Sequence, residues 1–210
     1  HCFMVDGTKL EIVDKYKYLG FIIKPSGIIT VGVDNLYAKA SRAWFNISTL
    51  VFNNKKMPYT RILNLFHSLV TSVALYSSEF WFPFGFTKKA LESTTSFLRS
   101  WENIKAQILH QKVCRMVLAV GKQTSRLATL GELGEFPLQC ISLTNTLKYE
   151  WHVRDKSKND SIIYAAFQEM KSMSADGKDC WLTRVNRIKV LLNVPFIPSH
   201  ISIKNVVQKI

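Results

Sequence analysis

The stretch Tyr16-Lys17-Tyr18-Leu19-Gly20-Phe21-Ile22-Ile23 decides the fold of the N-terminal part of the chain. Its aromatic and β-branched residues favour extended backbone, and we expect them to form one continuous strand. The turn-forming sequence Pro25-Ser26-Gly27 follows and should return the chain as another strand over residues 28–33. Residues 16–33 are therefore expected to form a β-hairpin.

A further hairpin is expected immediately upstream. The dipeptide Asp6-Gly7 separates two extended stretches, residues 2–5 and 8–13, and such a dipeptide closes tight hairpins because both positions tolerate positive φ. Together the hairpins occupy residues 1–33 and form a sheet that is too small to be stable alone. We therefore expect them to be the rim of a larger sheet.

Beyond residue 33 the hydrophobic pattern changes to the three-and-four spacing of helices with one buried face. Asp34 is the candidate N-cap of a first helix, Pro58 lies in the first turn of a second, and Thr87 caps a third. The third is expected to reach about Val120, with a break near residues 101–103. Short connections between these helices indicate a helical bundle over residues 34–123.

Residues 124–210 are expected to be helical as well, with an irregular tail. Gly121 is the expected C-terminal cap of the preceding helix, and Asp179 is the expected N-cap of the last one. The predicted helices of this region are 125–133, 138–154, 161–175 and 180–193. The predicted class is therefore α+β and mostly α: a small antiparallel β-hairpin rim, a helical bundle and further C-terminal helices.

The charge indicates a polyanionic partner. The chain has 28 basic and 15 acidic side chains, a formal net charge of +13 and a pI near 9.7. Residues 34–123 carry 12 basic and 4 acidic side chains, so eight of the thirteen excess charges lie in the predicted bundle. Nucleic acid is the first candidate partner and an acidic membrane surface the second. Lysines that merely keep a helical protein soluble would produce the same excess.

Cysteine spacing and hydropathy argue against two other kinds of site. The four cysteines include no Cys-x-x-Cys pair, so no zinc knuckle is expected, and Cys114, one helical turn after His110, is better explained as a buried thiol. The most apolar window, residues 63–86, is interrupted by His67 and Glu79 and is predicted to be a buried helix, with no membrane partner. No signal peptide is visible, and we expect an intracellular protein of the nucleus or cytoplasm.

Several short motifs follow one another along the chain. They are Lys17-Tyr18-Leu19-Gly20, Leu75-Tyr76-Ser77-Ser78-Glu79-Phe80-Trp81, the helix His110–Leu118 with Gly131–Leu138 after it, and Lys148-Tyr149-Glu150-Trp151. Their order resembles that in the reverse transcriptases of LINE-type (non-LTR) retrotransposons, and the resemblance covers residues 3–193. In that family a Tyr-Leu-Gly strand beside the palm is followed by a thumb with a Leu-Tyr-Gly-x-Glu-x-Trp-like stretch and, later, by a Gly-Glu-Leu-Gly-x-Phe-Pro-Leu segment.

The resemblance implies that residues 1–33 are the palm edge, residues 34–123 a thumb and residues 124–210 the region after the thumb. It makes Tyr18, Leu19 and Gly20 a primer grip, which holds the end of the growing DNA. A thumb lies along an RNA–DNA or DNA duplex and contacts its phosphates independently of sequence. From the resemblance and from their positions, the candidates for these phosphate contacts are Lys17, Lys39, Arg42, Lys55, Lys56 and Arg61.

The carboxylates of polymerisation are absent from the sequence. Nucleotide transfer needs aspartates that hold paired Mg²⁺ ions, and the chain contains no Asp-Asp pair. The resemblance places those aspartates, and the Mg²⁺ ions, in a palm upstream of His1, which itself lies in an expected strand. We therefore expect a fragment with no catalytic residue, metal or cofactor of its own, whose partners are a duplex and the remainder of the reverse transcriptase polypeptide.

Two other functions fit the same sequence. One is a helical protein-interaction module from a decayed or host-retained element, which Ser77 in place of the usual glycine would suit. The other is a basic helical protein at a membrane surface. The aromatic residues between Trp44 and Phe84 could stack on bases, but their helical spacing is typical of a core. Glu79 is expected to be a structural carboxylate.

Overall fold

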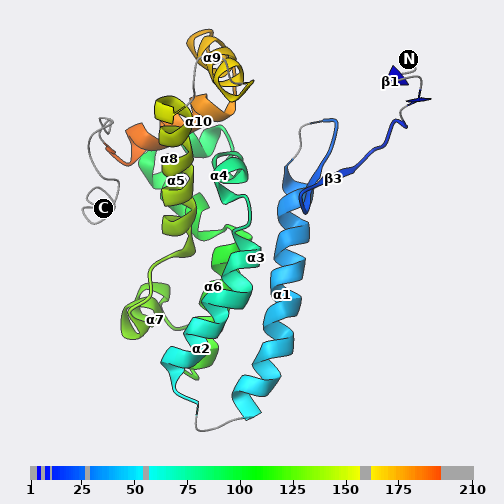
Figure 1. Cartoon of the computed structure of the whole chain (residues 1–210). Helices are drawn as coiled ribbons and strands as arrows, with labels where there is room; N and C mark the ends of the chain where they lie inside the picture. The colour runs from blue at the N-terminus through cyan, green and yellow to red at the C-terminus, as the bar shows by residue number, and fades with distance from the viewer. Residues whose placement is uncertain are drawn as a thin grey trace.

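The computed structural model describes residues 4–5, 8–9, 11–26, 29–53, 57–156 and 162–194. Within these residues the chain is mostly helical, with two short antiparallel strand pairs ahead of the helices, as Figure 1 shows. This arrangement confirms the predicted α+β, mostly α class. The irregular tail predicted after residue 194 lies outside the described residues.

The first strand pair confirms the predicted hairpin, although residues 11–13, which were expected to continue its second strand, are not in a strand. β1 (Met4–Val5) pairs antiparallel with β2 (Thr8–Lys9), and Val5 lies opposite Thr8 across the intervening pair of residues. Asp6 and Gly7 themselves lie outside the described residues. Within the described residues each strand pair is its own two-stranded sheet, so the larger sheet that they were expected to border stays a prediction.

The second strand pair corrects two predictions. Residues 16–23 do not form one strand: β3 (Tyr16–Tyr18) turns back at Leu19 and Gly20 and pairs antiparallel with β4 (Phe21–Ile23). Residues 28–33 do not form a strand either, because helix α1 (Thr30–Asn53) begins at Thr30. The valines at 31 and 33 favour a strand locally, but packing of the buried helix face overrides that preference.

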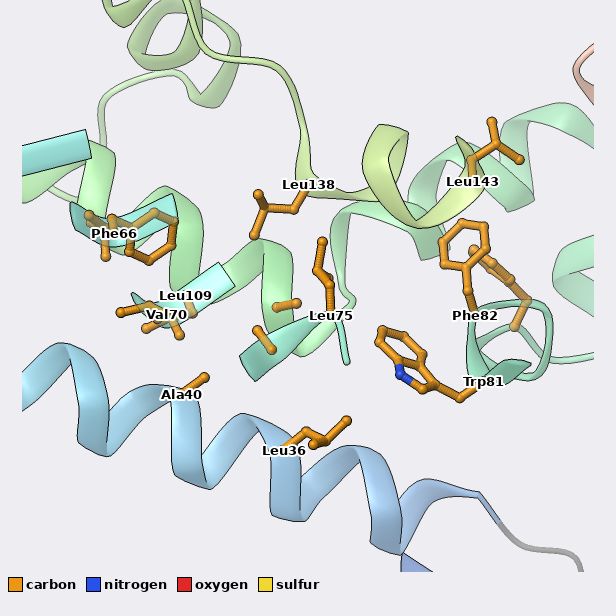
Figure 2. Close-up of a cluster of buried hydrophobic side chains, with 14 of the residues drawn as sticks. Leu36, Ala40, Phe66, Val70, Leu75, Trp81, Phe82, Leu109, Leu138 and Leu143 are labelled. Atoms are coloured by element: carbon orange, nitrogen blue, oxygen red, sulfur yellow. The ribbon is translucent and has the colours of Figure 1, made fainter. Parts of the chain in front are cut away.

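Helix α1 forms one side of the bundle. Its buried residues recur at helical spacing along one face, and Figure 2 shows Leu36 and Ala40 pointing from it into the core toward Val70 and Leu75. Asp34 is not the N-cap: it lies within the helix, and its carboxylate pairs with the ammonium of Lys105.

The second predicted helix is interrupted where one helix was expected. α2 (Tyr59–Phe66) continues through a π-helical turn, η1 (His67–Thr71), into α3 (Ser72–Ala74). Ser77 then takes a left-handed conformation (φ +54°) ahead of the short helix α4 (Ser78–Trp81). A left-handed residue ends a helix, so the apolar window is divided into short segments.

The rest of the bundle is made of short helices. The predicted break near residue 101 is confirmed between α5 (Thr94–Glu102) and α6 (Lys105–Val117). Gly121 is not the cap of α6: the helix ends at Val117, and Ala119 takes the left-handed position (φ +53°). The elements are η2 (Phe82–Gly85), η3 (Lys89–Glu92), α5 (Thr94–Glu102) and α6 (Lys105–Val117).

The C-terminal helices follow the prediction closely. They are α7 (Arg126–Leu133), α8 (Leu138–Lys156), α9 (Ile162–Ala175) and α10 (Trp181–Leu191). Gly134 ends α7 with φ +66°. Asp179 is not the N-cap of α10, because Cys180 takes that position. The Asp179 carboxylate instead accepts two hydrogen bonds from Arg184, at 2.7 and 2.8 Å. In Figure 1, α1 lies beside α2, α3 and α6, and α8, α9 and α10 gather at another part of the molecule.

The predicted aromatic core is correct in part. Trp44, Phe66 and Trp81 are buried in the main cluster, which contains residues of α1, α2, α6 and α8. Phe45, however, is 72% exposed, and Phe80 is 44% exposed. These rings follow the helical spacing of the core only approximately, and they lie at its border.

Gly32 fixes the strand pair β3–β4 to α1. A Cβ atom added at Gly32 would lie 2.4 Å from Cζ of Phe21 and 2.7 Å from the carbonyl oxygen of Ile22. Real Cβ atoms essentially never approach so closely, so the Phe21 ring occupies the space that any other side chain at position 32 would need. The glycine allows the buried ring of β4 to lie directly on the helix backbone.

We predict that Gly32→Ala destabilises the chain by about 1–3 kcal/mol, the usual cost of overpacking, although alanine in a helix is ordinarily favoured over glycine by about 1 kcal/mol. Gly131→Ala in α7 is the matched control, because nothing lies within 4 Å of its added Cβ, and it should stabilise by about 0.5–1 kcal/mol. Urea unfolding followed by circular dichroism measures both. Equal effects of the two substitutions would contradict the close packing at Gly32.

Candidate nucleic-acid interface

The turn of the β3–β4 hairpin is strained and exposed. Leu19 (φ +45°) and Gly20 (φ +91°) both have positive φ, as a type I′ hairpin turn requires. Leucine is a poor residue for this position, since the left-handed conformation costs a non-glycine residue roughly 1–2 kcal/mol. Its side chain is 72% exposed, so the described structure offers no burial that would offset the strain.

Tyr76 holds this turn from the side. Its hydroxyl donates a hydrogen bond of 2.5 Å to the carbonyl oxygen of Leu19, 57 residues away in sequence. Phe21 of β4 is buried and makes an edge-to-face contact with Phe80, at 6.4 Å between ring centres. The hairpin is therefore attached to both α1 and the segment that contains the Tyr76 motif.

The outer strand of the hairpin is open to solvent. All three residues of β3 are exposed, with Tyr16 at 60% and Tyr18 at 57%. Because successive side chains of a strand point to opposite faces, Tyr16 and Tyr18 lie on one face and Lys17 lies on the other. Next to the turn, the strand therefore presents two aromatic rings on one face and an ammonium group on the opposite face.

A shallow groove joins the hairpin to α1. It has a volume of about 370 Å³, and its lining includes Leu19 and Gly20 of the turn, Lys39 of α1 and Tyr76. The structure therefore brings together two of the three residues predicted for the primer grip and one of the predicted phosphate contacts. Residues 20 and 39 come from separate elements, and the docked hairpin creates this proximity.

Arg42 follows Lys39 on the polar side of α1. A separation of three residues places both side chains on neighbouring positions of the helix surface. Lys39 is partly buried beside Leu36, which lines the same groove, whereas Arg42 lies farther from the core. Arg42 is exposed, and its Nε donates a 3.3 Å hydrogen bond to the carbonyl oxygen of Ala38, in its own helix. Its guanidinium therefore remains on the surface.

The other predicted cations are less close to the hairpin. Arg61 is exposed in the first turn of α2, and Figure 1 shows α2 starting near the end of α1 opposite to the hairpin. The 24 residues of α1 span roughly 36 Å, so Arg61 lies far from the hairpin. Lys55 and Lys56 lie outside the described residues.

Four of the predicted cations, Lys17, Lys39, Arg42 and Arg61, form no ion pair among the described residues. Other cations of the same chain do: Lys105 pairs with Asp34, and Arg126 pairs with Glu102 at 2.9 Å. A basic side chain that has no acidic partner within the protein can bind an anion from solution.

Two polar clusters were not anticipated from the sequence. Glu150 is buried between Arg154 and Lys189, and its carboxylate lies 2.7 Å from the Lys189 ammonium. Desolvation, together with the charge of Arg154, lowers the pKa of Lys189 to about 8. This group joins α8 to α10. Glu150 and Arg154 are an i,i+4 pair on α8, but Lys189 is 39 residues from Glu150, so no spacing rule predicts its contact. The second cluster consists of His67, His110 and Glu135. The sequence analysis noted His67 only because it interrupts an apolar window.

Comparison with models of known protein families, with curated proteins and with solved structures found no match. In the described part of the chain, no helix is both long enough and apolar enough to cross a membrane.

We predict that Tyr76→Phe weakens the attachment of the hairpin turn. The lost hydrogen bond should cost about 0.5–1.5 kcal/mol, and amide exchange of residues 16–23 should accelerate while exchange in α8 does not change. Tyr59→Phe is the control, because the Tyr59 side chain is half exposed and has no hydrogen bond in the described structure. Hydrogen exchange followed by NMR measures the difference. Unaltered exchange at the hairpin in Tyr76→Phe would show that the turn is held by other contacts.

Proposed function

We propose that this chain is the palm-edge and thumb portion of a non-LTR retrotransposon reverse transcriptase, and that it grips the template–primer duplex without sequence preference. The catalytic aspartates and their Mg²⁺ ions would belong to the remainder of that polypeptide, and the chain alone is then inactive. Its place of action would be the nucleus or cytoplasm. The observation that carries the proposal is the exposed Tyr16–Gly20 hairpin docked beside Lys39.

The hairpin has the features of a surface that contacts a nucleic-acid end. Aromatic rings stack on bases or sugars of any sequence, and each stacked base contributes about 1–3 kcal/mol. Tyr16 and Tyr18 are exposed, and Lys17 lies between them. Leu19 adds support, because its backbone conformation is strained and its side chain is exposed. Strained backbone conformations of this kind are common at functional positions.

The basic positions fit contact along a duplex. From the hairpin to the start of α2, the surface runs over the length of α1, roughly 36 Å, which is close to one turn of a duplex of about ten base pairs. Lys39 and Arg42 lie along this length, and Arg61 lies at its end. Cations without an internal acidic partner can neutralise phosphates without first breaking an ion pair.

We predict that the chain binds an RNA–DNA hybrid with strong salt dependence, and that Lys39→Ala and Arg42→Ala each reduce the slope of log K against log salt by about 1. Binding should weaken equally for hybrids of unrelated sequence, because phosphates carry no sequence information. Fluorescence anisotropy of a labelled hybrid at several salt concentrations measures the slope.

Arg187→Ala on α10 is the matched control, since Arg187 is an exposed cation on another element, and its slope should equal that of the unchanged chain. Circular dichroism checks that each variant is folded. Absence of binding at low salt would remove the proposal in favour of a helical module that binds protein. An equal slope for all three variants would show that the duplex lies elsewhere on the chain.

A further inference from the structure

Three side chains from distant parts of the sequence meet in the core of the bundle. His67 is the first residue of η1, His110 lies in the middle of α6, and Glu135 follows the end of α7. Nε2 of His67 lies 2.8 Å from Oε2 of Glu135, and Nε2 of His110 lies 3.3 Å from the same oxygen. The potential ligand atoms of all three residues lie within 4.8 Å of one another.

His110 is completely buried, and its ring nitrogens have no hydrogen-bond partner among the described residues. Its exposed fraction is 0%. The 3.3 Å approach to Glu135 is within ion-pair distance but lacks hydrogen-bond geometry. A buried polar group without a partner ordinarily costs about 1–3 kcal/mol, so such groups are uncommon and call for an explanation.

The ring of His110 is firmly oriented. It stacks on Phe66 with an interplanar angle of 8° and 5.5 Å between ring centres. With the ring held in this way, its Nε2 lies 3.3 Å from the Glu135 carboxylate. An imidazole nitrogen that is not otherwise engaged has a lone pair that can bind a metal ion.

His67 is oriented by a partner on its other nitrogen. Nδ1 of His67 lies 3.3 Å from the hydroxyl oxygen of Thr71, one helical turn later, while Nε2 faces Glu135. In metal sites, the ring nitrogen that does not bind the ion is commonly held by such a contact, which fixes the tautomer and the ring direction. Thr71 is itself buried, so this contact is sheltered from solvent.

We propose that His67, His110 and Glu135 form a binding site for a divalent transition-metal ion of the zinc class, with a water molecule as the fourth ligand. Two histidines and one carboxylate are a ligand set that zinc accepts. The ion would supply the partner that His110 lacks and would connect η1, α6 and the segment after α7. The site is separate from the proposed duplex-binding surface, and neither depends on the other.

The distances suit such an ion. Ligand atoms around a tetrahedral zinc ion with bonds of about 2.0–2.1 Å lie roughly 3.3–3.4 Å apart. The His110–Glu135 separation of 3.3 Å already meets this value, and the His67–Glu135 separation of 2.8 Å must open slightly. Access is available from the surface, because the side chains of His67 and Glu135 are 32% and 15% exposed.

The competing explanation is an ordinary His67–Glu135 ion pair beside a buried histidine. A metal-free ion pair stabilises the chain equally with and without zinc. A metal site stabilises it only when the ion is supplied, because an ion that binds the folded state selectively shifts the unfolding equilibrium. The response of the melting temperature to zinc therefore distinguishes the two.

The test is thermal melting and calorimetric titration of the purified chain with Zn²⁺, after treatment with a chelator and its removal. We expect one equivalent of Zn²⁺ to bind and to raise the melting temperature. His67→Ala and Glu135→Gln should abolish both effects. His152→Ala, at an exposed histidine of α8, should retain both.

Thr71→Val provides a second variant that keeps all three ligands. It should weaken Zn²⁺ binding by roughly 10- to 100-fold, the usual effect of removing an orienting contact. This measurement decides the matter if His67→Ala or Glu135→Gln does not fold. Absence of a zinc-dependent rise in the unchanged chain would overturn the proposal, as would an equal rise in the unchanged chain and in every folded variant.

Discussion

The contact between the Phe21 ring and the backbone of α1 at Gly32 is the constraint on which the N-terminal architecture depends. A two-stranded hairpin is marginally stable in water, so β3 and β4 need a surface to pack against. Gly32 provides it by leaving the space that the Phe21 ring fills, and this docking places the Leu19–Gly20 turn against Tyr76 and beside Lys39. Because the hairpin is held at two points, its outer strand can remain exposed without losing its position. The groove and the open tyrosines are consequences of that packing.

The helices were largely predictable from the sequence, whereas the turns were not. Periodic hydrophobic residues located α1 and α7 to α10 because burial of one face decides them, whereas the second and third predicted helices are each divided into shorter segments. The hairpin turn at residue 19 was missed because leucine rarely adopts positive φ, and only the tertiary contacts of the hairpin retain it there. The end of α6 was misplaced for a similar reason: Ala119 takes the left-handed position two residues before the expected glycine. At residue 19 the local preference lost to a longer-range contact, because Tyr76 donates a hydrogen bond to the turn from 57 residues away.

The candidate sites differ in how far they could be predicted from the sequence. The motif at residues 17–20 and the charge at Lys39 were visible, but their proximity depends on docking that no spacing rule describes. The His67, His110 and Glu135 cluster was invisible in the same way: its members are 25 to 68 residues apart and come together only when η1, α6 and the end of α7 pack. His110 had been considered only with Cys114, its neighbour on the same helix. Burial raises the pKa of that thiol to about 12, as expected for an inert buried cysteine.

The two proposals give different functions to different parts of one helical bundle. The hairpin and the polar face of α1 would meet a duplex, and the buried histidine cluster would hold the helices behind that face. Hydrogen–deuterium exchange by mass spectrometry, with and without a saturating RNA–DNA hybrid, tests the central claim that the docked hairpin and α1 form one nucleic-acid surface. The account predicts new protection in residues 16–23 and in the part of α1 around residues 35–46, with little change in α8 to α10. Protection confined to α8 to α10, or none in the hairpin, would contradict it.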